Sequence, residues 1–172
     1  MFWLAKIQGF DHRLFFWLNR SKYHAHLILP SKICSFIANG PLYIGIAIFL
    51  MVFGNSAISQ TLAIAFALER PVYFFLKSTC RRARPSAALP TFVSAIIPGD
   101  RFSFPSGHTS GAFVFAGIIG SYFPVLSGPL LIWAGLVGLS RVLLGVHFVT
   151  DIMAGAAMGS LFALATLGYP GV

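Results

Sequence analysis

The chain has 172 residues, of which 57% are hydrophobic and 9% are charged, and its mean hydropathy is +0.82. Soluble domains carry about one-quarter charged residues, so this composition excludes an ordinary soluble protein and predicts an integral membrane protein with one domain, residues 1–172. Twelve Lys and Arg against four Asp and Glu give a net charge of +8, which favours anionic lipid headgroups or a phosphorylated substrate as partners. Burial in a membrane argues against nucleic acid.

Residues 1–20 are predicted to form an amphipathic helix that lies in the membrane interface rather than crossing the bilayer. The apolar residues of this segment recur at spacings of four and three, with charged residues between them: Trp3, Ile7, Phe10, Leu14 and Trp17, and Lys6, Asp11, Arg13 and Arg20. We expect no cleavable signal peptide, because Lys6 and Asp11 interrupt the apolar region that such a peptide needs.

Five apolar stretches after residue 26 predict an all-α, polytopic membrane helix bundle with about five transmembrane helices. Short turns are expected at residues 54–56 and 126–128. The predicted spans are residues 33–53, 57–76, 109–125, 129–144 and 150–167.

Counting membrane crossings places the polar segments on one side. If the first span starts on a given side, the second span returns there and delivers residues 77–104, and the third departs just after His108. The fourth span comes back at Arg141, and the fifth leaves from His147. Ionisable residues at membrane depth are costly and are usually functional, so their collection on one side predicts a site there.

The first polar segment, KSTCRRARP at residues 77–85, provides two cations. Lys77 and Arg84 are seven residues apart, about two helical turns, so both would project from one stripe if the second span continues to residue 83. Pro85 then disfavours helix at Arg84 and ends the element. Taken alone, the segment equally fits a membrane helix that ends in interfacial cations.

The second segment, PSGH at residues 105–108, stands at the start of an apolar helix. The backbone N–H groups of Ser106, Gly107 and His108 would lie unpaired at a helix N-terminus, where the helix dipole favours an anion. Gly107 would let that anion approach the backbone closely. By itself, the quartet also fits an ordinary serine cap beside an uninvolved histidine.

The third segment, SRVLLGVHFVTD at residues 140–151, contains a histidine and a carboxylate four residues apart. His147 and Asp151 would share one face if the last span starts near His147. The carboxylate could then accept a hydrogen bond from one imidazole nitrogen and leave the other free to act as a nucleophile. A structural His–Asp pair fits this segment equally well when it is taken alone.

Together the three segments resemble the three-part signature of the type 2 phosphatidic acid phosphatase (PAP2) superfamily. The matching positions are Lys77, Arg84 and Pro85, then Pro105 to His108, then Ser140, Arg141, His147 and Asp151. The resemblance implies a bundle of membrane helices, usually six, that removes phosphate from lipid phosphates and diphosphates with neither metal nor cofactor. The short form of this chain resembles the bacterial undecaprenyl diphosphate phosphatases of that superfamily.

The resemblance also implies a role for each signature residue. His147 would attack phosphorus and form a phosphohistidine, Asp151 would hold its tautomer, and His108 would give a proton to the departing lipid oxygen. The remaining positions would surround the non-bridging phosphate oxygens: Lys77, Arg84, Arg141 and the amides of Ser106 and Gly107. The expected substrate is a polyprenyl diphosphate, phosphatidic acid or phosphatidylglycerol phosphate, and the sequence predicts no oligomeric state.

Other readings of the same residues stay open. A phosphotransferase that passes the phosphoryl group to a lipid acceptor would use identical residues. A non-haem iron oxygenase would use His108, His147 and Asp151 as metal ligands, although three nearby cations would oppose the bound metal. A two-metal hydrolase would need more carboxylates than Asp100 and Asp151. A non-catalytic scaffold is the remaining alternative.

Residues outside the signature carry weaker expectations. A buried pair between Glu69 and Arg70 is expected within the second span, with headgroup selection as its alternative. Arg81, Arg82 and Arg101 are expected to be solvated interfacial charges, with a wider cationic entrance for a diphosphate as the alternative. Gly155 and Gly159 are expected to permit close helix packing.

Membrane orientation is ambiguous from the sequence. The positive-inside rule would place the cation-rich side in the cytoplasm. The family resemblance implies the opposite, a site on the extracytoplasmic side of a bacterial inner membrane. We favour the latter, because the site's own cations serve phosphate binding and those of residues 1–20 could bind lipid headgroups.

Overall fold

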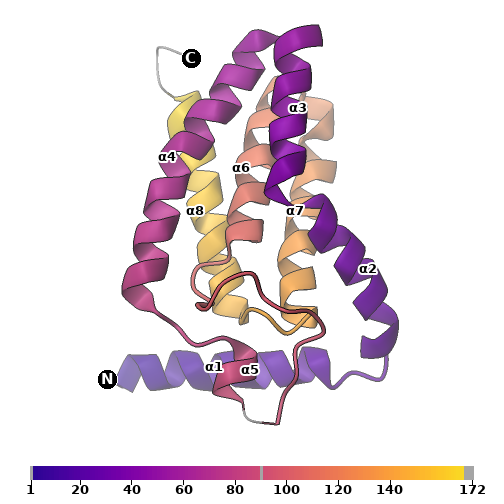
Figure 1. Cartoon of the computed structure of the whole chain (residues 1–172), viewed down its shortest axis with the longest axis vertical. Helices are drawn as coiled ribbons and strands as arrows, with labels where there is room; N and C mark the ends of the chain where they lie inside the picture. The colour runs from indigo at the N-terminus through magenta and orange to yellow at the C-terminus, as the bar shows by residue number, and fades with distance from the viewer. Residues whose placement is uncertain (1, 90, 169–172) are drawn as a thin grey trace.

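The computed structural model describes residues 2–89 and 91–168, with side chains from residue 8 onward. Its regular elements in these ranges are α-helices, and a single isolated β-bridge joins Ala83 to Phe102. Figure 1 shows the helices in chain order: α1 (Phe2–Asn19), α2 (His24–Ile37), α3 (Gly40–Phe53), α4 (Ser56–Cys80), α5 (Pro85–Ala88), α6 (Gly107–Tyr122), α7 (Pro124–Leu143) and α8 (Val149–Leu167). The predicted all-α class is confirmed.

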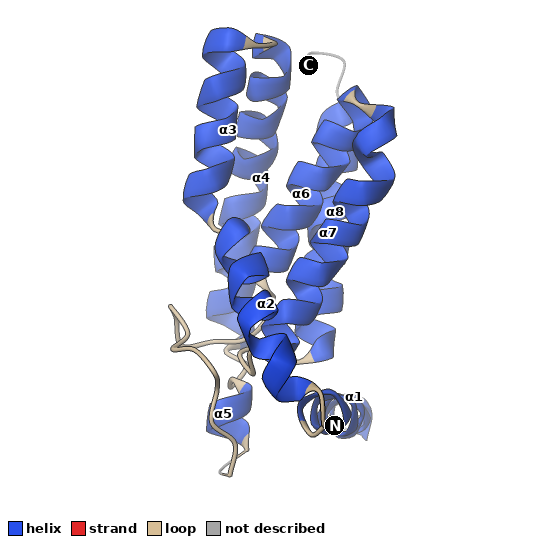
Figure 2. Ribbon diagram, turned by 90° about the vertical axis from the view of Figure 1, so that its right-hand side faces the viewer, coloured by secondary structure: helices blue, strands red, loops and turns tan. Residues whose placement is uncertain are grey.

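The long helices run roughly side by side, and α1 lies across one end of the bundle (Figure 1). Helix α6 is central, since it packs against α4, α7 and α8. Figure 2 shows α3 and α4 as a pair beside the group of α6, α7 and α8. Apolar side chains from α3, α4, α6 and α8 form the main core, including Tyr43, Leu62, Ile118 and Ala163. The short helix α5 and the loops around it lie at the same end as α1.

Fewer helices meet a strict test for membrane spans than the five predicted. Within the described residues, α7 and α8 are long and apolar enough to cross a membrane, and α2 with α3 forms a third candidate that is bent by 44°. Helix α4 is long enough, with 25 residues, but carries Glu69, Arg70 and Lys77, and α6 has 16 residues. Five spans therefore remain an expectation.

Two predicted boundaries were wrong. The first span begins earlier, at His24, and is interrupted at Ala38 and Asn39. The next helix starts at Gly40, and Pro41 occupies its first turn, where proline is well tolerated. The turn expected at residues 126–128 lies at Phe123, because Pro124 is the first residue of α7. The turn at residues 54–56 is confirmed, with the Asn55 side chain accepting a hydrogen bond from the Ala57 N–H at 2.9 Å.

Glycines bring α6 and α8 into close contact. A Cβ atom at Gly155 would lie 2.5 Å from the Ser106 carbonyl oxygen, and one at Gly159 would lie 2.3 Å from that of Ser110. The prediction that these two glycines permit close helix packing is therefore confirmed. The contact places the start of α6, where Gly107 and His108 lie, directly beside the start of α8.

Helix α1 buries one face against the rest of the protein, and the sequence did not indicate this contact. Phe15 is fully buried against Phe92 and Phe148, and Asp11 is fully buried as well. Two residues of the predicted apolar stripe, Phe10 and Trp17, are exposed, which agrees with a helix whose other face meets lipid. The predicted contributions of Trp3 and Ile7 lie outside the side chains that the structure describes.

Candidate active site

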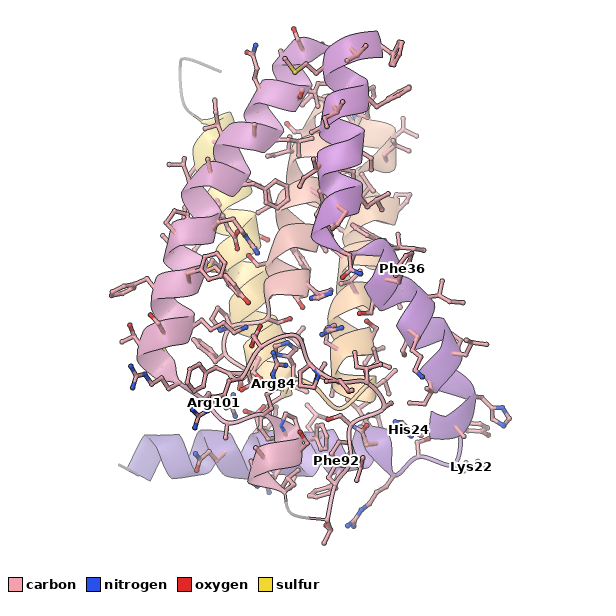
Figure 3. The ribbon with its side chains drawn as sticks, in the orientation of Figure 1. Lys22, His24, Phe36, Arg84, Phe92 and Arg101 are labelled. Atoms are coloured by element: carbon pink, nitrogen blue, oxygen red, sulfur yellow. The ribbon has the colours of Figure 1, made fainter. Side chains whose placement is uncertain are left out.

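A cavity of about 690 Å³ runs from the end of the bundle that α1 crosses along α3 and α4, and Figure 3 shows the Arg84 side chain at this end. Six predicted site residues line the cavity: Lys77, Arg84, Gly107, His108, Arg141 and His147. From these polar residues the cavity continues between α3 and α4 along an apolar wall that includes Ile44, Ile48, Met51, Leu62 and Phe66. The predicted convergence of separate segments on one side of the bundle is therefore observed.

Lys77 and Arg84 converge on one carboxylate rather than sharing a helical stripe. Helix α4 ends at Cys80, Arg81 is left-handed with φ of 45°, and Arg84 is extended before Pro85. The two Asp100 oxygens accept from Lys77 Nζ at 2.9 Å and from Arg84 Nη2 at 2.7 Å. The condition for a shared stripe, a second span that continues to residue 83, is not met, because the left-handed Arg81 ends the helix at Cys80.

The Asp100 carboxylate is held by charge. Burial by itself would raise the pKa of Asp100, but its hydrogen bonds to Lys77 and Arg84 and the charges of these residues lower that pKa below its usual value. An ionised carboxylate thus occupies the space between two cations. An anion that contacted both cations would therefore compete with Asp100 for them.

Arg84 is anchored from several directions. Its Nε donates to the Asp100 carbonyl at 2.9 Å, and its Nη1 donates to the Val146 carbonyl at 2.7 Å. The same Nη1 lies 3.4 Å from His147 Nε2. The nitrogen of His147 that faces the cavity is therefore next to a guanidinium, a neighbour that disfavours a bound metal ion and favours an anion.

His147 lies two residues before α8, so the condition for a shared helix face with Asp151, a last span that includes His147, is not met. The Asp151 side chain reaches back from α8, accepts from the Phe148 N–H at 2.8 Å, and brings Oδ2 to 3.6 Å from His147 Nδ1. Burial lowers the pKa of His147 below its usual value, against the opposing effect of Asp151 and together with the charges of Arg84 and Arg141. The imidazole is consequently neutral near pH 7, the form in which it has a free lone pair.

The start of α6 differs from the prediction at one residue. The Ser106 N–H donates to the Asp151 carbonyl at 3.1 Å, and the Ser106 hydroxyl pairs with Thr109 Oγ1 at 2.9 Å. Ser106 is fully buried and does not line the cavity. We therefore correct the expectation for its amide, which joins α6 to α8. Gly107 and His108, the first two residues of α6, have N–H groups without acceptors inside the helix.

His108 is oriented by a residue that the sequence analysis did not single out. Its Nε2 lies 2.9 Å from Oδ1 of Asn39, the residue at the break between α2 and α3. Asn39 stands at the position that precedes α3 but makes no capping bond with its side chain. The bend in the first span therefore has a consequence for the site, because it brings an amide to the second histidine.

Arg141 enters the cavity from α7 and is almost completely buried. Its Nη1 donates to the Ser35 hydroxyl, whereas its buried Nε has no acceptor among the residues that the structure describes. A buried guanidinium with a donor to spare is suited to an anionic ligand.

Several further residues of the site gave little signal in the sequence. Tyr73 accepts from Lys77 Nζ at 2.6 Å, and its ring lies 2.9 Å from where a Cβ of Gly107 would be. Arg82 was wrongly expected to be solvated, since it bonds inward to two carboxylates. The expected Glu69–Arg70 pair is confirmed, and Glu69 also accepts from Ser110 at 2.5 Å. No spacing rule could have paired Arg82 with Asp11, 71 residues away.

Within the described parts of the chain, no group of three or more His, Cys, Asp and Glu side chains is arranged to hold a metal ion. The polar lining of the cavity consists mainly of cations and imidazoles.

The fold and this site define a helical membrane protein with a cationic cavity at one end of its bundle. Residues 42–171 match the model of the PAP2 superfamily, and the chain therefore belongs to that superfamily. The family and the integral membrane class that the sequence predicted are confirmed.

Relatives of known function and structure agree with this placement. Phosphatidylglycerophosphatase B of Bacillus subtilis is 35% identical over 118 residues, which are 62% of this chain and 55% of that protein. The bacitracin transport permease protein BcrC of Bacillus licheniformis is 34% identical over 101 residues, 59% of this chain and 50% of that protein. The chain spans about half the length of these curated relatives.

The solved structure of LpxE from Aquifex aeolicus superposes with a TM-score of 0.82 at 29% identity, covering 91% of this chain and 94% of that one. The structure of the transmembrane PAP2-type phosphatidylglycerolphosphate phosphatase from Bacillus subtilis superposes with a TM-score of 0.76 at 26% identity, covering 95% of this chain and 85% of that one. The transmembrane PAP2 fold is therefore shared along nearly the whole chain.

Proposed function

We propose that this protein is a lipid phosphatase that hydrolyses a phosphate monoester or diphosphate on a membrane lipid, without a metal ion, through a phosphohistidine intermediate. The observation that carries this proposal is one cavity that joins two imidazoles and four cations to an apolar groove. A lipid phosphate has the same two parts, an anionic head and an apolar tail. The name of one relative, phosphatidylglycerophosphatase B, supports the same class of substrate.

The proposed reaction starts with a neutral His147. Its Nε2 attacks phosphorus, the phosphorus–nitrogen bond forms, and the bond to the lipid oxygen breaks. His108 donates the proton that the departing oxygen needs. Asp151 Oδ2, on the other side of the ring, stabilises the positive charge that develops on the imidazole. Asn39 holds His108 at the cavity wall by its contact with Nε2, so that Nδ1 is the nitrogen available to the substrate.

Water completes the proposed cycle. His108 accepts a proton from the attacking water, the phosphorus–nitrogen bond breaks, and inorganic phosphate leaves. Lys77, Arg84 and Arg141 stabilise the charge on the non-bridging oxygens in both steps, and the Gly107 amide adds a neutral donor. The substrate must first displace the Asp100 carboxylate from the two cations that it bridges.

The apolar wall between α3 and α4 is where we place the lipid tail. Ile44, Ile48 and Met51 are exposed on the surface of α3, so the groove opens toward the position of the bilayer core. Arg70, which is paired with Glu69, lines the same cavity. It is a candidate ligand for a second phosphate or a polar headgroup, and this supports testing diphosphates beside monophosphates.

Phosphate release from a panel of lipids tests the proposal. Purified protein should release phosphate from at least one of phosphatidylglycerol phosphate, phosphatidic acid, undecaprenyl diphosphate and lipid A 1-phosphate, with a chelator present. His147→Ala should abolish turnover, and normal turnover by this variant would refute the nucleophile assignment. Release that depends on an added acceptor lipid would identify a phosphotransferase instead.

We further propose that the protein lies in a bacterial inner membrane with the cavity facing the extracytoplasmic side. Four cations at that end, Lys77, Arg82, Arg84 and Arg141, are used within the protein or in the cavity, which weakens the positive-inside signal.

A further inference from the structure

The N-terminal helix contributes a buried carboxylate to the far side of the active site. Asp11 of α1 is fully buried and accepts from the Thr150 N–H at 3.0 Å and from the Thr150 hydroxyl. Thr150 is the second residue of α8, so its N–H is one of those that the helix itself leaves unpaired. Asp11 therefore caps α8 from another helix, where the positive end of the helix dipole favours a carboxylate.

A single guanidinium connects this carboxylate to Asp151. Arg82 Nη2 donates to Asp11 Oδ2 at 2.5 Å, and Arg82 Nη1 donates to Asp151 Oδ1 at 2.7 Å and to Thr150 Oγ1 at 2.7 Å. The Arg82 guanidinium also lies over the Phe148 ring, 4.6 Å from its centroid. Its side chain is 20% exposed, so the contacts are largely shielded from water.

Both oxygens of Asp151 are fixed by these contacts. Oδ1 accepts from Arg82, and Oδ2 accepts from the Phe148 N–H and faces His147 Nδ1. A continuous row of contacts thus runs from α1 through the segment after α4 to the start of α8 and then to His147. Charges alternate along the row, from Asp11 to Arg82 to Asp151.

We propose that Asp11 and Arg82 are positioning residues for the reaction, which hold Asp151 in the orientation that aligns His147. This inference rests on the proposed role of His147 as nucleophile. Asp11 lies outside residues 42–171, the part of the chain that matches the superfamily, so the row extends the site into a helix beyond that part. The amphipathic helix at the membrane interface is then a component of the active site.

Charge balance explains why both residues are needed. Arg82 without Asp11 would be a largely buried cation with one partner, and it would draw the Asp151 carboxylate away from His147. Asp11 without Arg82 would be a buried anion held by Thr150 alone. Breaking a buried pair by removing one member leaves an uncompensated charge, which is more disruptive than removing both.

The pH dependence of the reaction distinguishes positioning from mere structural support. Several charged or titratable groups surround His147. Arg84 lies in the segment after α4, Arg141 on α7 and Lys77 across the cavity on α4. His108 lies on α6 and Asp151 on α8. Arg82→Gln removes a positive charge behind Asp151, so the pKa of His147 should rise and the acid limb of kcat/KM should move to higher pH. Asp11→Asn removes a negative charge, so the limb should move to lower pH.

The experiment measures kcat, KM and the pH profile of the full-length protein with the lipid that gives the highest turnover. Asp11→Asn and Arg82→Gln should each lower kcat about tenfold or more while KM stays within about threefold, with acid limbs displaced in opposite directions by about half a pH unit. The double variant should recover a limb close to wild type. Arg81→Gln is the matched control, since Arg81 is exposed and should leave kcat and the limb unchanged.

Arg82→Lys keeps the inference testable if Arg82→Gln fails to fold. Lysine retains the charge but cannot reach Thr150, Asp151 and Asp11 together, so kcat should fall while the acid limb stays in place. Two results would overturn the positioning role. In the first, kcat of Asp11→Asn and Arg82→Gln stays within twofold of wild type. In the second, both variants lose kcat equally and the acid limbs of their pH profiles coincide. Failure of the proposed function looks different, because wild type itself would then release no phosphate or His147→Ala would remain active.

Discussion

At the scale of single residues, Asp100 is the feature of the site that most changes how a ligand must enter. Its carboxylate bridges Lys77 and Arg84, the two cations that the proposed function assigns to phosphate. From the sequence, Asp100 was expected only as a possible metal ligand. Its actual position makes it a competitor for the same anionic ligand, since both cannot occupy the space between the two cations.

Asp100→Asn should therefore strengthen the binding of simple anions. The amide keeps the shape of the side chain but removes the charge that competes with the ligand, so orthophosphate or vanadate should inhibit at concentrations about threefold or more lower than in wild type. Inhibition curves with a fixed lipid substrate measure this. Curves that coincide with those of wild type would mean that Asp100 leaves the site at no cost.

The guanidiniums of Arg84 and Arg141 provide the second prediction at this scale. Arg84→Ala and Arg141→Ala should each cut turnover by a factor of about a hundred or more, because a lost donor to transition-state charge costs on the order of 3 kcal/mol. Phosphate release under saturating lipid measures the loss. Arg101→Ala is a suitable control, as Arg101 is exposed and does not line the cavity. A loss of turnover below fivefold in either variant would show that the substituted arginine does not bind the phosphate.

The signature residues were predictable because the spacing of each motif is short and local. Six of the eight predicted site residues line one cavity, and Asp151 contacts His147 from behind. Ser106 was misassigned because its amide meets the Asp151 carbonyl from a distant segment. Asn39 escaped notice and Arg82 was wrongly expected to be solvated for the same reason, since their partners are reached only through the folded chain. Tyr73 is only four residues from its partner Lys77, but nothing in the sequence marked it as part of the site.

At the scale of helices, the contact between α6 and α8 sets the geometry of the site. The two glycines of α8 let the backbones approach so closely that the start of α6 is bonded to the start of α8 through Ser106 and Asp151. The histidines of the two segments consequently face one cavity. In a bilayer the hydrophobic effect does not drive helices together, because lipid tails are as apolar as the side chains. Close packing through small residues is therefore the expected way for such helices to associate.

Gly159→Ala should disturb this contact. Its Cβ would lie 2.3 Å from the Ser110 carbonyl oxygen, which belongs to the backbone and cannot move aside cheaply. We expect a loss of about 1–3 kcal/mol in stability and a lower unfolding temperature in detergent. Gly135→Ala on α7 is the matched control, because nothing lies within 4 Å of its added Cβ. An unfolding temperature for Gly159→Ala equal to that of the control would show that the helices can separate freely.

Helix boundaries were harder to predict than helix existence. Apolar composition identifies a membrane helix but does not mark where it bends, so the break at Asn39 and the early start of α7 were missed. The end of α4 at Cys80 depends on a left-handed arginine, which no sequence preference favours. The prediction that the polar segments share one side was still correct, because the side on which a segment lies depends on the number of spans before it and not on where each span begins or ends.

At the scale of the whole molecule, the site, α1 and the connections around them lie at one end of the bundle, and the turn between α3 and α4 lies at the other (Figure 1). Cys80 is exposed at the end of α4 near the site, and Asn55 is exposed in the far turn. These two positions report on opposite sides of the membrane if the bundle crosses it.

Cysteine labelling tests the proposed orientation. In intact bacterial cells, a membrane-impermeant maleimide should label Cys80, and a Cys80→Ser, Asn55→Cys variant should react only after the cells are broken. The reverse pattern would place the site in the cytoplasm, as the positive-inside rule favours. Equal labelling of both positions in intact cells would contradict a bundle that crosses the membrane in this way.

The sequence by itself determined the membrane class, the helical fold, the family and the residues of the signature, since each depends on composition or on short spacings. Only the tertiary structure decided that Asp100 bridges the two leading cations, that Asn39 holds His108, and that Asp11 and Arg82 lie behind Asp151. Charges in a membrane protein must find partners away from lipid, and those partners come from segments that the chain brings together only when it folds.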